Sequence, residues 1–440
     1  MNKSLLIFIT YSLFIIPFTY IKAQDKLQSD TADYFNAGFL RYENHIYTPN
    51  IHTVQLTPLG AEMGAPLLKL DHGDQLVLSF DDLDNEAKTY SYTFIHCDAN
   101  WTPSDVDKNL YIKGYTDEPL DNYRNSFNTL TKYLHYQLIF PTESMVPTVT
   151  GNYIILVYRD YDPQKIVLTR RFMIYDNKVD IDAHVHRATI IDDMKTKQKV
   201  DFSVLYEKYK IDNPFDDIKI VITQNDRWDN AITNLKPLFL KDHALDYGYD
   251  KENTFDGGNE FRFFDTRSFH FLAEHIYRFE YDSTGLHHTI LEQDQRRSAH
   301  RYLTEPDING AYLVHVEGSQ DAGVDADYTT VHFSLPMSEP EANGNLYVFG
   351  GFSDWTYGDA TKMKYSYDNK SYHTSLQLKQ GYYNYQYVFV KDGSNAADES
   401  LIEGSHYETE NDYMIYVYHR PMGSRYDMLI GVRKVNSLKG

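Results

Sequence analysis

Short segments in which apolar and polar residues alternate dominate this sequence and constrain its fold class. Alternation with a period of two is typical of β-strands that bury one face. Gly, Pro, Asn and Asp separate the segments, among them DQLVLSFDDL, TYSYTFIHCD, YLHYQLIFP, GNYIILVYRD and LTRRFMIYD. No helical periodicity extends beyond a few turns. The chain is therefore predicted to be all-β and built of antiparallel sandwiches.

The side-chain pattern within these segments predicts which residues share a face. In TYSYTFIHCD, the residues at 90, 92, 94 and 96 should face one way and those at 91, 93, 95 and 97 the other. Cys97, the only cysteine of the chain, is then a small buried residue with no disulfide partner. The 39 tyrosines suit strands with one wet face, because tyrosine has an apolar body and a polar tip.

At 440 residues the chain is too long for a single sandwich. We expect three immunoglobulin-like or E-set β-sandwich domains in series, covering 34–177, 178–336 and 337–440. The last boundary rests on HFSLPMSEPEANG, whose Pro, Ser and Gly are typical of a linker.

The amino terminus, MNKSLLIFITYSLFIIPFTYIKAQ, has the layout of a secretory signal peptide over residues 1–23. A positive start precedes a mostly apolar run from Leu5 to Ile16, Pro17 interrupts it, and Ala23 offers a small residue for cleavage. An uncleaved anchor counted from Leu5 to Ile21 is the alternative, but it is short for a membrane span. We expect an exported, soluble mature protein.

The chain is strongly acidic, with 42 Lys and Arg against 63 Asp and Glu and a formal charge of −21. Cleavage after Ala23 removes Lys3 and Lys22 and no acid, which gives 40 − 63 = −23. Such a charge disfavours nucleic acid and anionic membrane surfaces as partners.

One histidine pair has the spacing of metal ligands. His184 and His186 in DAHVHRA could converge on one ion from one face of a strand. They also continue the polar side of a simple alternation, and we favour that solvated face. His287 and His288 fall in a polar stretch that we expect to be mobile.

TFDGGNEFRFFDTRSF brings Asp256, Glu260 and Asp265 together around two glycines, and those carboxylates could hold Ca²⁺. We favour a tight turn in which the glycines at 257–258 supply positive φ. Arg262 is then a candidate partner of Asp265.

The sequence contains no motif that places a nucleophile beside a base. It has no GxSxG and no glycine-rich phosphate loop before a helix. A glycosidase carboxylate pair stays an alternative, because such pairs are rarely close in sequence. We predict a protein that is not an enzyme and carries no metal or cofactor.

Several long segments resemble a known family: YTFIHCDANWTPSD (92–105), NYRNSFNTLTKYLHYQLIFP (122–141), GNYIILVYRD (151–160) and FDGGNEFRFFD (255–265). Together they are similar to the plug protein of the Bacteroidota type IX secretion system. The resemblance extends over nearly all of the mature chain and is densest in the first predicted domain. It implies a periplasmic protein that seals the translocon, the large outer-membrane β-barrel of that system, when no cargo is present.

The third predicted domain resembles glycogen- and starch-binding sandwich modules, through VFGGFSDW and LQLKQGYYNYQYVFVKDG. The positions that match their pattern mainly specify fold; they are Gly351, Phe352, Trp355, Gly381, Tyr383, Tyr385, Phe389, Asp392 and Gly393. Those modules hold sugar with further exposed tryptophans and a lysine, whereas Trp355 is the only tryptophan of this domain. A structural role is favoured, with Trp355 also a candidate contact for a partner protein.

The leading hypothesis is therefore a plug with the translocon barrel as its partner. Its acidic character favours a basic rim on that barrel. The alternative is a soluble glycan-binding protein that uses the C-terminal sandwich.

Overall fold

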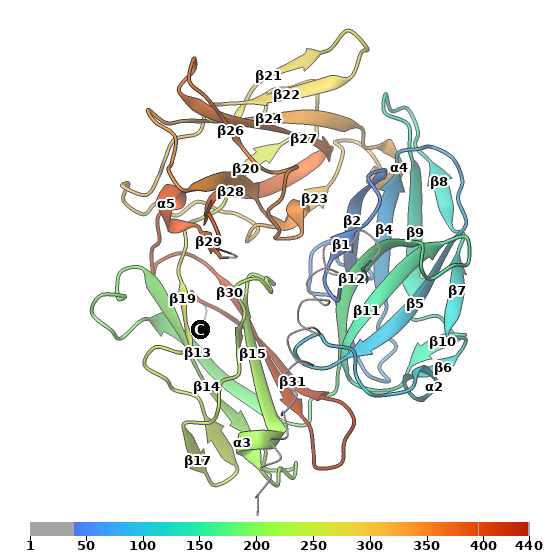
Figure 1. The fold of residues 1–440 in the computed structure, drawn as a ribbon, viewed down its shortest axis with the longest axis vertical. Helices are drawn as coiled ribbons and strands as arrows, with labels where there is room; N and C mark the ends of the chain where they lie inside the picture. The colour runs from blue at the N-terminus through green and yellow to red at the C-terminus, as the bar shows by residue number, and fades with distance from the viewer. Residues whose placement is uncertain (1–38, 395, 439–440) are drawn as a thin grey trace, which may run out of the picture. The chain divides into compact units, whose positions relative to one another are not determined.

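The computed structural model describes residues 39–394 and 396–438 and is built almost entirely of β-strands (Figure 1). The all-β prediction is confirmed. The described residues from Tyr42 onward form one compact unit, in which the strands group into three sandwiches. The predicted signal peptide lies outside the described residues. None of the described helices is long and apolar enough to cross a membrane.

Sandwich 1 consists of two main sheets that enclose a core with residues from both. One sheet has the order β1-β12-β11-β5-β7, with β3 parallel to β12, and the other has the order β2-β4-β9-β8. The rings of Phe80 and Tyr136 stack in this core, 5.1 Å apart. Its elements are β1 (His45–Ile46), β2 (Ile51–Pro58), β3 (Leu67–Lys69), β4 (Leu76–Asp82), β5 (Tyr90–Cys97), α2 (Lys108–Tyr111), β6 (Ile112–Gly114), β7 (Asp117–Leu120), β8 (Tyr123–Asn125), β9 (Leu134–Phe140), β10 (Met145–Pro147), β11 (Gly151–Arg159) and β12 (Ile166–Tyr175).

Sandwich 2 packs the sheet β13-β14-β18-β17 against the sheet β16-β15-β30-β31. Its core contains the stacked rings of Phe202 and Tyr247, 4.6 Å apart. Its elements are β13 (Asp180–Arg187), β14 (Lys197–Leu205), α3 (Pro214–Asp217), β15 (Ile218–Gln224), β16 (Ile232–Thr233), β17 (Phe239–Lys241), β18 (Ala244–Asp246), β19 (Thr254–Asp256), β30 (Asp412–His419) and β31 (Met428–Asn436).

Sandwich 3 packs a sheet centred on β28 against the sheet β21-β22-β24-β27-β26. The inner aromatic residues of β28 include Tyr383, Tyr385 and Tyr387, all buried. Its elements are β20 (Arg262–Asp265), β21 (Ile276–Tyr281), β22 (His287–Leu291), β23 (Tyr312–Val314), α4 (Ala322–Asp325), β24 (Tyr328–Pro336), β25 (Gly344–Phe349), η1 (Gly351–Ser353), β26 (Lys364–Ser366), β27 (Ser371–Lys379), β28 (Gly381–Lys391), β29 (Ala397–Asp398) and α5 (Ser400–Glu403).

Strand pairing does not follow the boundary predicted at 336/337. β15 pairs with β30 from Ile218↔His419 to Gln224↔Tyr413, so the C-terminal strands complete sandwich 2. β20 pairs with β28, and β24 pairs with β27, within sandwich 3. We therefore assign about 259–404 to sandwich 3, inserted into sandwich 2. The segment HFSLPMSEPEANG includes the end of β24 and the connection from β24 to β25 inside sandwich 3.

Candidate functional site

The three sandwiches meet in a junction where aromatic and charged side chains from different sandwiches touch one another. Trp355 lies in this junction. It follows β25 and η1, and both Asp354 and Trp355 have positive φ, which turns the chain sharply. The ring contacts Phe349 and Phe261 edge to face, with centroids 5.4 and 5.9 Å away.

Arg227 of sandwich 2 covers a face of the Trp355 ring, with Cζ 4.9 Å from the ring centroid. The guanidinium also pairs with Glu399 of sandwich 3 at 2.6 Å and with Asp229 at 2.7 Å. Burial alone would lower the pKa of Arg227, but these two carboxylates raise it above its ordinary value. A charged arginine thus holds sandwich 2 to sandwich 3, and we call Arg227, Glu399 and Trp355 the arginine joint.

A second set of aromatic contacts joins sandwich 1 to sandwich 2. Trp101 and Trp228 meet edge to face at 4.9 Å, and Trp228 stacks on Tyr416 at 5.6 Å. Arg171 lies 4.4 Å from the Trp101 centroid and donates two hydrogen bonds to the Tyr42 carbonyl, at 2.9 and 2.7 Å. Cation–π pairs of this kind gain strength when they are desolvated. Trp101, Arg171, Trp228 and Tyr416 form the tryptophan joint.

Sandwich 3 is fastened to sandwich 1 by a buried ion pair. Lys379 at the end of β27 reaches Asp81 of β4 with an Nζ–Oδ2 distance of 2.6 Å, and both side chains are 1% exposed. The Tyr328 hydroxyl donates to the same oxygen at 2.7 Å, and Nδ1 of His135 lies 2.7 Å from Oδ1. Lys379 Nζ also sits 4.2 Å from the centroid of the Tyr133 ring.

These contacts keep the carboxylate charged inside the protein. Burial alone would raise the pKa of Asp81, but attraction to Lys379 and hydrogen bonding with His135 lower it below its ordinary value. Removing one member of such a set leaves the others buried without compensation. Asp81, His135, Tyr328 and Lys379 form the ionic joint.

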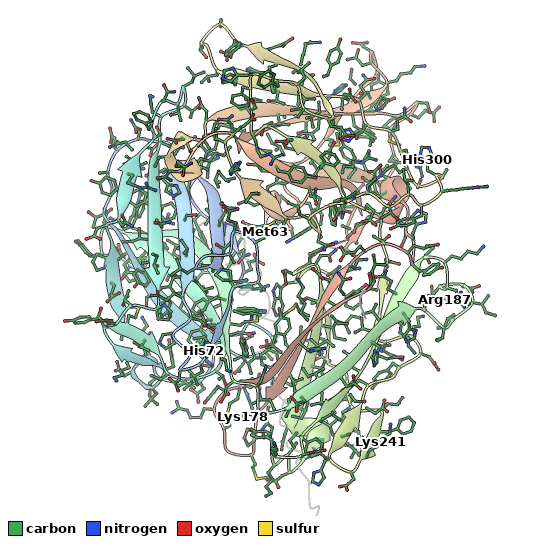
Figure 2. The ribbon with its side chains drawn as sticks, turned by 180° about the vertical axis from the view of Figure 1, so that it is seen from behind. Met63, His72, Lys178, Arg187, Lys241 and His300 are labelled. Atoms are coloured by element: carbon green, nitrogen blue, oxygen red, sulfur yellow. The ribbon has the colours of Figure 1, made fainter. Side chains whose placement is uncertain are left out.

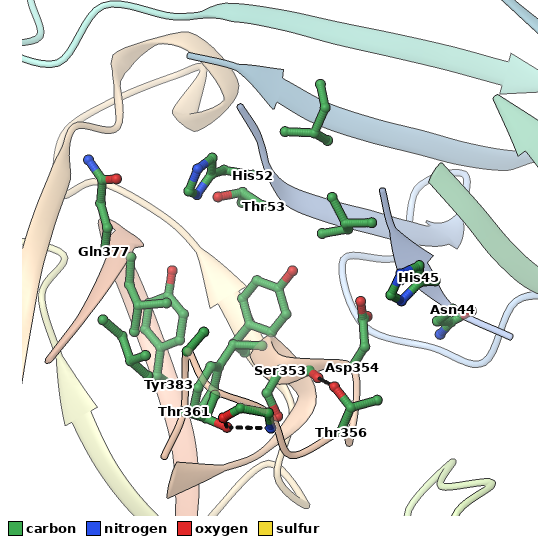
Figure 3. A pocket seen from close by; sticks show the side chains of 18 of the residues that line it. Asn44, His45, His52, Thr53, Ser353, Asp354, Thr356, Thr361, Gln377 and Tyr383 are labelled. Carbon is green, nitrogen blue, oxygen red and sulfur yellow. Dashed lines mark hydrogen bonds between the residues drawn. The ribbon is translucent and has the colours of Figure 1, made fainter. Parts of the chain in front are cut away.

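Two adjoining cavities, of about 460 and 480 Å³, lie between the joints. Both are lined by Asn44, Tyr312 and Asp354, and Met63, labelled in Figure 2, borders the second. Figure 3 shows the first cavity, with His52 and other side chains of sandwich 1 facing side chains of sandwich 3. Arg170 bridges the sandwiches here through an ion pair with Asp354 at 3.0 Å. Burial raises the pKa of Asp354, although Arg170 opposes that rise.

Comparison with known proteins identifies the family of sandwich 1. The model of the type 9 secretion system plug protein first domain matches residues 51–176, which run from the start of β2 to just past β12. The crystal structure of a hypothetical protein from Parabacteroides merdae is 33% identical and covers 90% of this chain and 100% of its own, with a TM-score of 0.87. Residues 51–176 therefore belong to the family of type 9 secretion system plug protein first domains.

Other comparisons add little to this assignment. Trypsin-activated alpha-2-macroglobulin from Escherichia coli is 10% identical and covers 88% of this chain and 23% of its own. Its TM-score of 0.16 is too low to indicate a shared fold. No curated protein matches the chain.

The histidines weighed as metal ligands pair with carboxylates. His184 and His186 are exposed on β13 and face different carboxylates: His184 Nε2 lies 3.5 Å from Asp182, and His186 Nε2 lies 2.8 Å from Asp201. The polar stretch around His287 and His288 forms a strand: the two residues open β22, and His287 is buried. Among residues 39–394 and 396–438, no three His, Cys, Asp or Glu side chains form a metal-binding group.

The carboxylates considered for Ca²⁺ are also separated. Asp256 Oδ1 lies 3.6 Å from Lys197 Nζ, Glu260 accepts a hydrogen bond from Tyr302, and Asp265 pairs with Arg267. The predicted pair between Arg262 and Asp265 is therefore wrong.

Arg262 instead joins a charged cluster inside sandwich 3. It contacts Asp294 at 2.7 Å and the buried Glu403 at 3.0 Å. Arg262 lies beside Asp265 in sequence, but β20 directs its side chain toward α5, which the sequence could not indicate.

The glycines at 257–258 form a turn, but only Gly258 has positive φ, at 67°. Gly257 is required for another reason: a Cβ there would lie 1.9 Å from the His406 carbonyl oxygen.

The sequence singled out Trp355 among the residues of the junction and missed most of the others. Lys379, Asp81, Arg171 and Arg227 are charged residues within or beside strands, and such residues are normally read as solvent-facing. Their partners lie 200 or more residues away in some cases, such as the 298-residue separation of Asp81 and Lys379. The only sign of these joint residues in the sequence is a lone charged residue in an otherwise strand-like segment. Such a residue does not indicate which distant side chain it will contact.

Proposed function

We propose that this chain binds the periplasmic end of the outer-membrane translocon barrel of the type IX secretion system and seals it while no cargo is present. The observation that carries the proposal is the plug-domain match over residues 51–176. The 33% identity to the Parabacteroides merdae protein over 90% of the chain supports treating all three sandwiches as one functional protein. A plug of this kind works in the periplasm, on the inner side of the outer membrane.

The joints support a sealing role on physical grounds. A seal across a wide pore must resist deformation, and domains joined by small polar interfaces normally move relative to one another. Here a buried ion pair, a desolvated tryptophan–arginine cluster and a second buried arginine connect the three sandwiches. We infer that the sandwiches enter and leave the barrel as one body.

The charge of the chain supports a reversible contact. A mature protein with a formal charge of −23 associates faster with a basic surface and is repelled by acidic ones. We expect a basic periplasmic rim on the barrel and an affinity that falls as salt is added.

The proposed role requires no chemistry from the chain. The matched family is a secretion-system plug, and the fold is all-β. Glycan binding at Trp355 would require the sugar to replace Arg227, which lies over the ring and pairs with two carboxylates.

Two measurements test the proposal. The tagged chain is expected to recover the translocon barrel from solubilised outer membranes, and to recover less of it when folded cargo occupies the barrel. The purified chain should also lower the ion conductance of the barrel in planar bilayers. A chain that neither recovers the barrel nor changes its conductance is not its plug.

A further inference from the structure

The outermost strand of sandwich 3, β21, has an open edge that carries several exposed aromatic side chains. β21 ends the sheet β21-β22-β24-β27-β26, and in the described residues it pairs only with β22 (Figure 1). Exposed fractions on β21 are 59% for Tyr277 and 64% for Tyr281, and the preceding loop presents Phe271 at 73% and Leu272 at 61%. Apolar side chains gathered on one hairpin of a soluble domain mark an interaction site.

The backbone of β21 is also available for hydrogen bonding. Asp282 N donates to Leu286 O at 3.1 Å, and the register pairs Glu280 with His288. Hydrogen-bonded and non-bonded pairs alternate along an antiparallel ladder. The N–H and C=O groups of Phe279 and Tyr281 therefore point away from β22, toward the open side.

Longer edge strands of the molecule are less accessible. β2 borders the junction cavities, and the carbonyl of Val54 there accepts a hydrogen bond from the Tyr312 hydroxyl at 3.3 Å. β13 begins beside β31, where Lys178 N donates to Ile430 O at 2.8 Å. The edge of β17 is exposed but has three residues, against six in β21.

The charge of the residues around β21 indicates what kind of segment could bind at its open edge. Residues 268–293 contain Glu274, Glu280, Asp282 and Glu292 against Arg278, which gives 1 − 4 = −3 with neutral histidines. Arg278 is itself paired with Glu280, at an Nε–Oε1 distance of 2.5 Å. Hydrogen bonds from Thr284 and Leu286 lower the pKa of Asp282 to about 2, so it stays charged.

We propose that the open edge of β21 is the docking strand on which the chain receives an extended, positively charged segment of the translocon barrel. Added strands bind through backbone hydrogen bonds, and the side chains of the edge select the sequence. The aromatic residues beside β21 would cover the apolar side chains of the incoming segment, and the acidic residues would pair with its Lys and Arg. This inference rests on the proposed function, because it names the contact surface for the same partner.

The first test compares the binding of purified variants to the purified barrel in detergent. Tyr281→Pro removes the outward N–H and leaves the ladder with β22 intact, so we expect at least tenfold weaker binding. Glu274→Lys should weaken binding about threefold to tenfold at low salt and less at high salt. Two controls on the tip of sandwich 2, Phe239→Ala and Asp242→Lys, should bind within twofold of the wild type; these side chains are 59% and 97% exposed.

The second test does not depend on the stability of the proline variant. A photoreactive maleimide is attached to Tyr277→Cys or, as control, to Phe239→Cys; Cys97 is buried and stays unlabelled. We expect the label at 277 alone to cross-link to the barrel, at a segment rich in Lys and Arg.

The outcomes separate the two proposals. If the wild-type chain binds the barrel and the Tyr281→Pro variant binds equally well, the docking strand is wrong and the plug function stands. A cross-link from 277 to a second copy of the chain also overturns the docking strand. If the wild-type chain does not bind the barrel, both proposals fail.

Discussion

Replacing Lys379 with methionine tests whether the ionic joint holds sandwich 3 to sandwich 1. Methionine keeps most of the apolar stem and removes the ammonium group that lies 2.6 Å from Asp81 and 2.8 Å from the Gly323 carbonyl. Both charged side chains are 1% exposed, so water cannot replace the lost partner. Breaking a buried ion pair of this kind costs about 3–5 kcal/mol. Tyr328 and His135 still contact Asp81, which places the expected loss near 3 kcal/mol.

Tryptophan fluorescence during urea unfolding measures this loss. The chain has three tryptophans, and all three lie at joints between sandwiches, so their emission reports on the separation of the sandwiches. With an unfolding slope of about 3 kcal/mol/M, a loss of 3 kcal/mol lowers the midpoint by roughly 1 M. The control is Lys210→Met, which removes a lysine that pairs with Asp212 at 2.6 Å but is 83% exposed. Its effect should stay below about 0.5 kcal/mol.

A double-mutant cycle decides whether the loss comes from the ion pair. Asp81→Asn combined with Lys379→Met leaves no buried charge unpaired, so the double variant should be less destabilised than the sum of the two single variants. We expect a coupling of about 1–3 kcal/mol. Additive effects, or a Lys379→Met variant within 1 kcal/mol of the wild type, would refute the reasoning.

Four further measurements test a thiol, a ring, a glycine and a carboxylate of the chain. Burial raises the pKa of Cys97 to about 12, so a thiol reagent at pH 8 should not label the folded chain but should label it fully in concentrated guanidinium chloride; rapid labelling of the folded chain would contradict this. Trp355→Ala should lower the free energy of unfolding by about 2–3 kcal/mol. Calorimetry should detect no α-glucan binding by the wild type or by this variant. Binding by the wild type that the substitution abolishes would instead support the glycan-binding alternative. Gly257→Ala should cost roughly 3 kcal/mol or more, measured by thermal unfolding, because its Cβ would collide with the His406 carbonyl. The pKa of Asp81 is lower in the folded than in the unfolded chain, so its stabilisation is complete above about pH 4 and is lost as the pH falls further; fluorescence at decreasing pH should show an acid transition that weakens in Asp81→Asn.

The strands could be predicted because their pattern is local, but the surfaces that cover them could not. In β5 the predicted burial of Cys97 is confirmed. The general expectation that tyrosine-rich strands have one wet face does not hold for β5, because seven of its eight residues are buried. Cys97 packs with Met414, Tyr416 and Leu429, which belong to the C-terminal strands of sandwich 2. Nothing in TYSYTFIHCD indicates that a second sandwich covers its other face.

The same limit explains why the charged joints were missed. Lys379 follows Gln377, Ser375 and His373 on the outer side of β27, and such an alternation is the normal sign of a solvated face. Ser375 and Gln377 are exposed, but Lys379 is buried because sandwich 1 covers the end of the strand and supplies Asp81. The sequence predicts that Lys379 lies on the polar side of a strand. It does not predict the ion pair with Asp81, because that pair depends on how distant segments pack.

The order of the sandwiches along the chain was hidden for a related reason. The Pro- and Gly-containing segment before Gly344 resembles a domain linker, yet it is a connection between the two sheets of one sandwich. The chain enters sandwich 3 at Gly257–Gly258 and leaves it at Ser405–His406. These two connections are hydrogen-bonded to each other, because His406 N donates to Gly258 O at 2.8 Å and Gly258 N donates to Ser405 Oγ at 3.1 Å. Adjacent entry and exit points are what allow one domain to be inserted in another without opening its host. A pairing such as β15 with β30, whose two strands lie on either side of the whole inserted sandwich in the sequence, leaves no local signal in either strand.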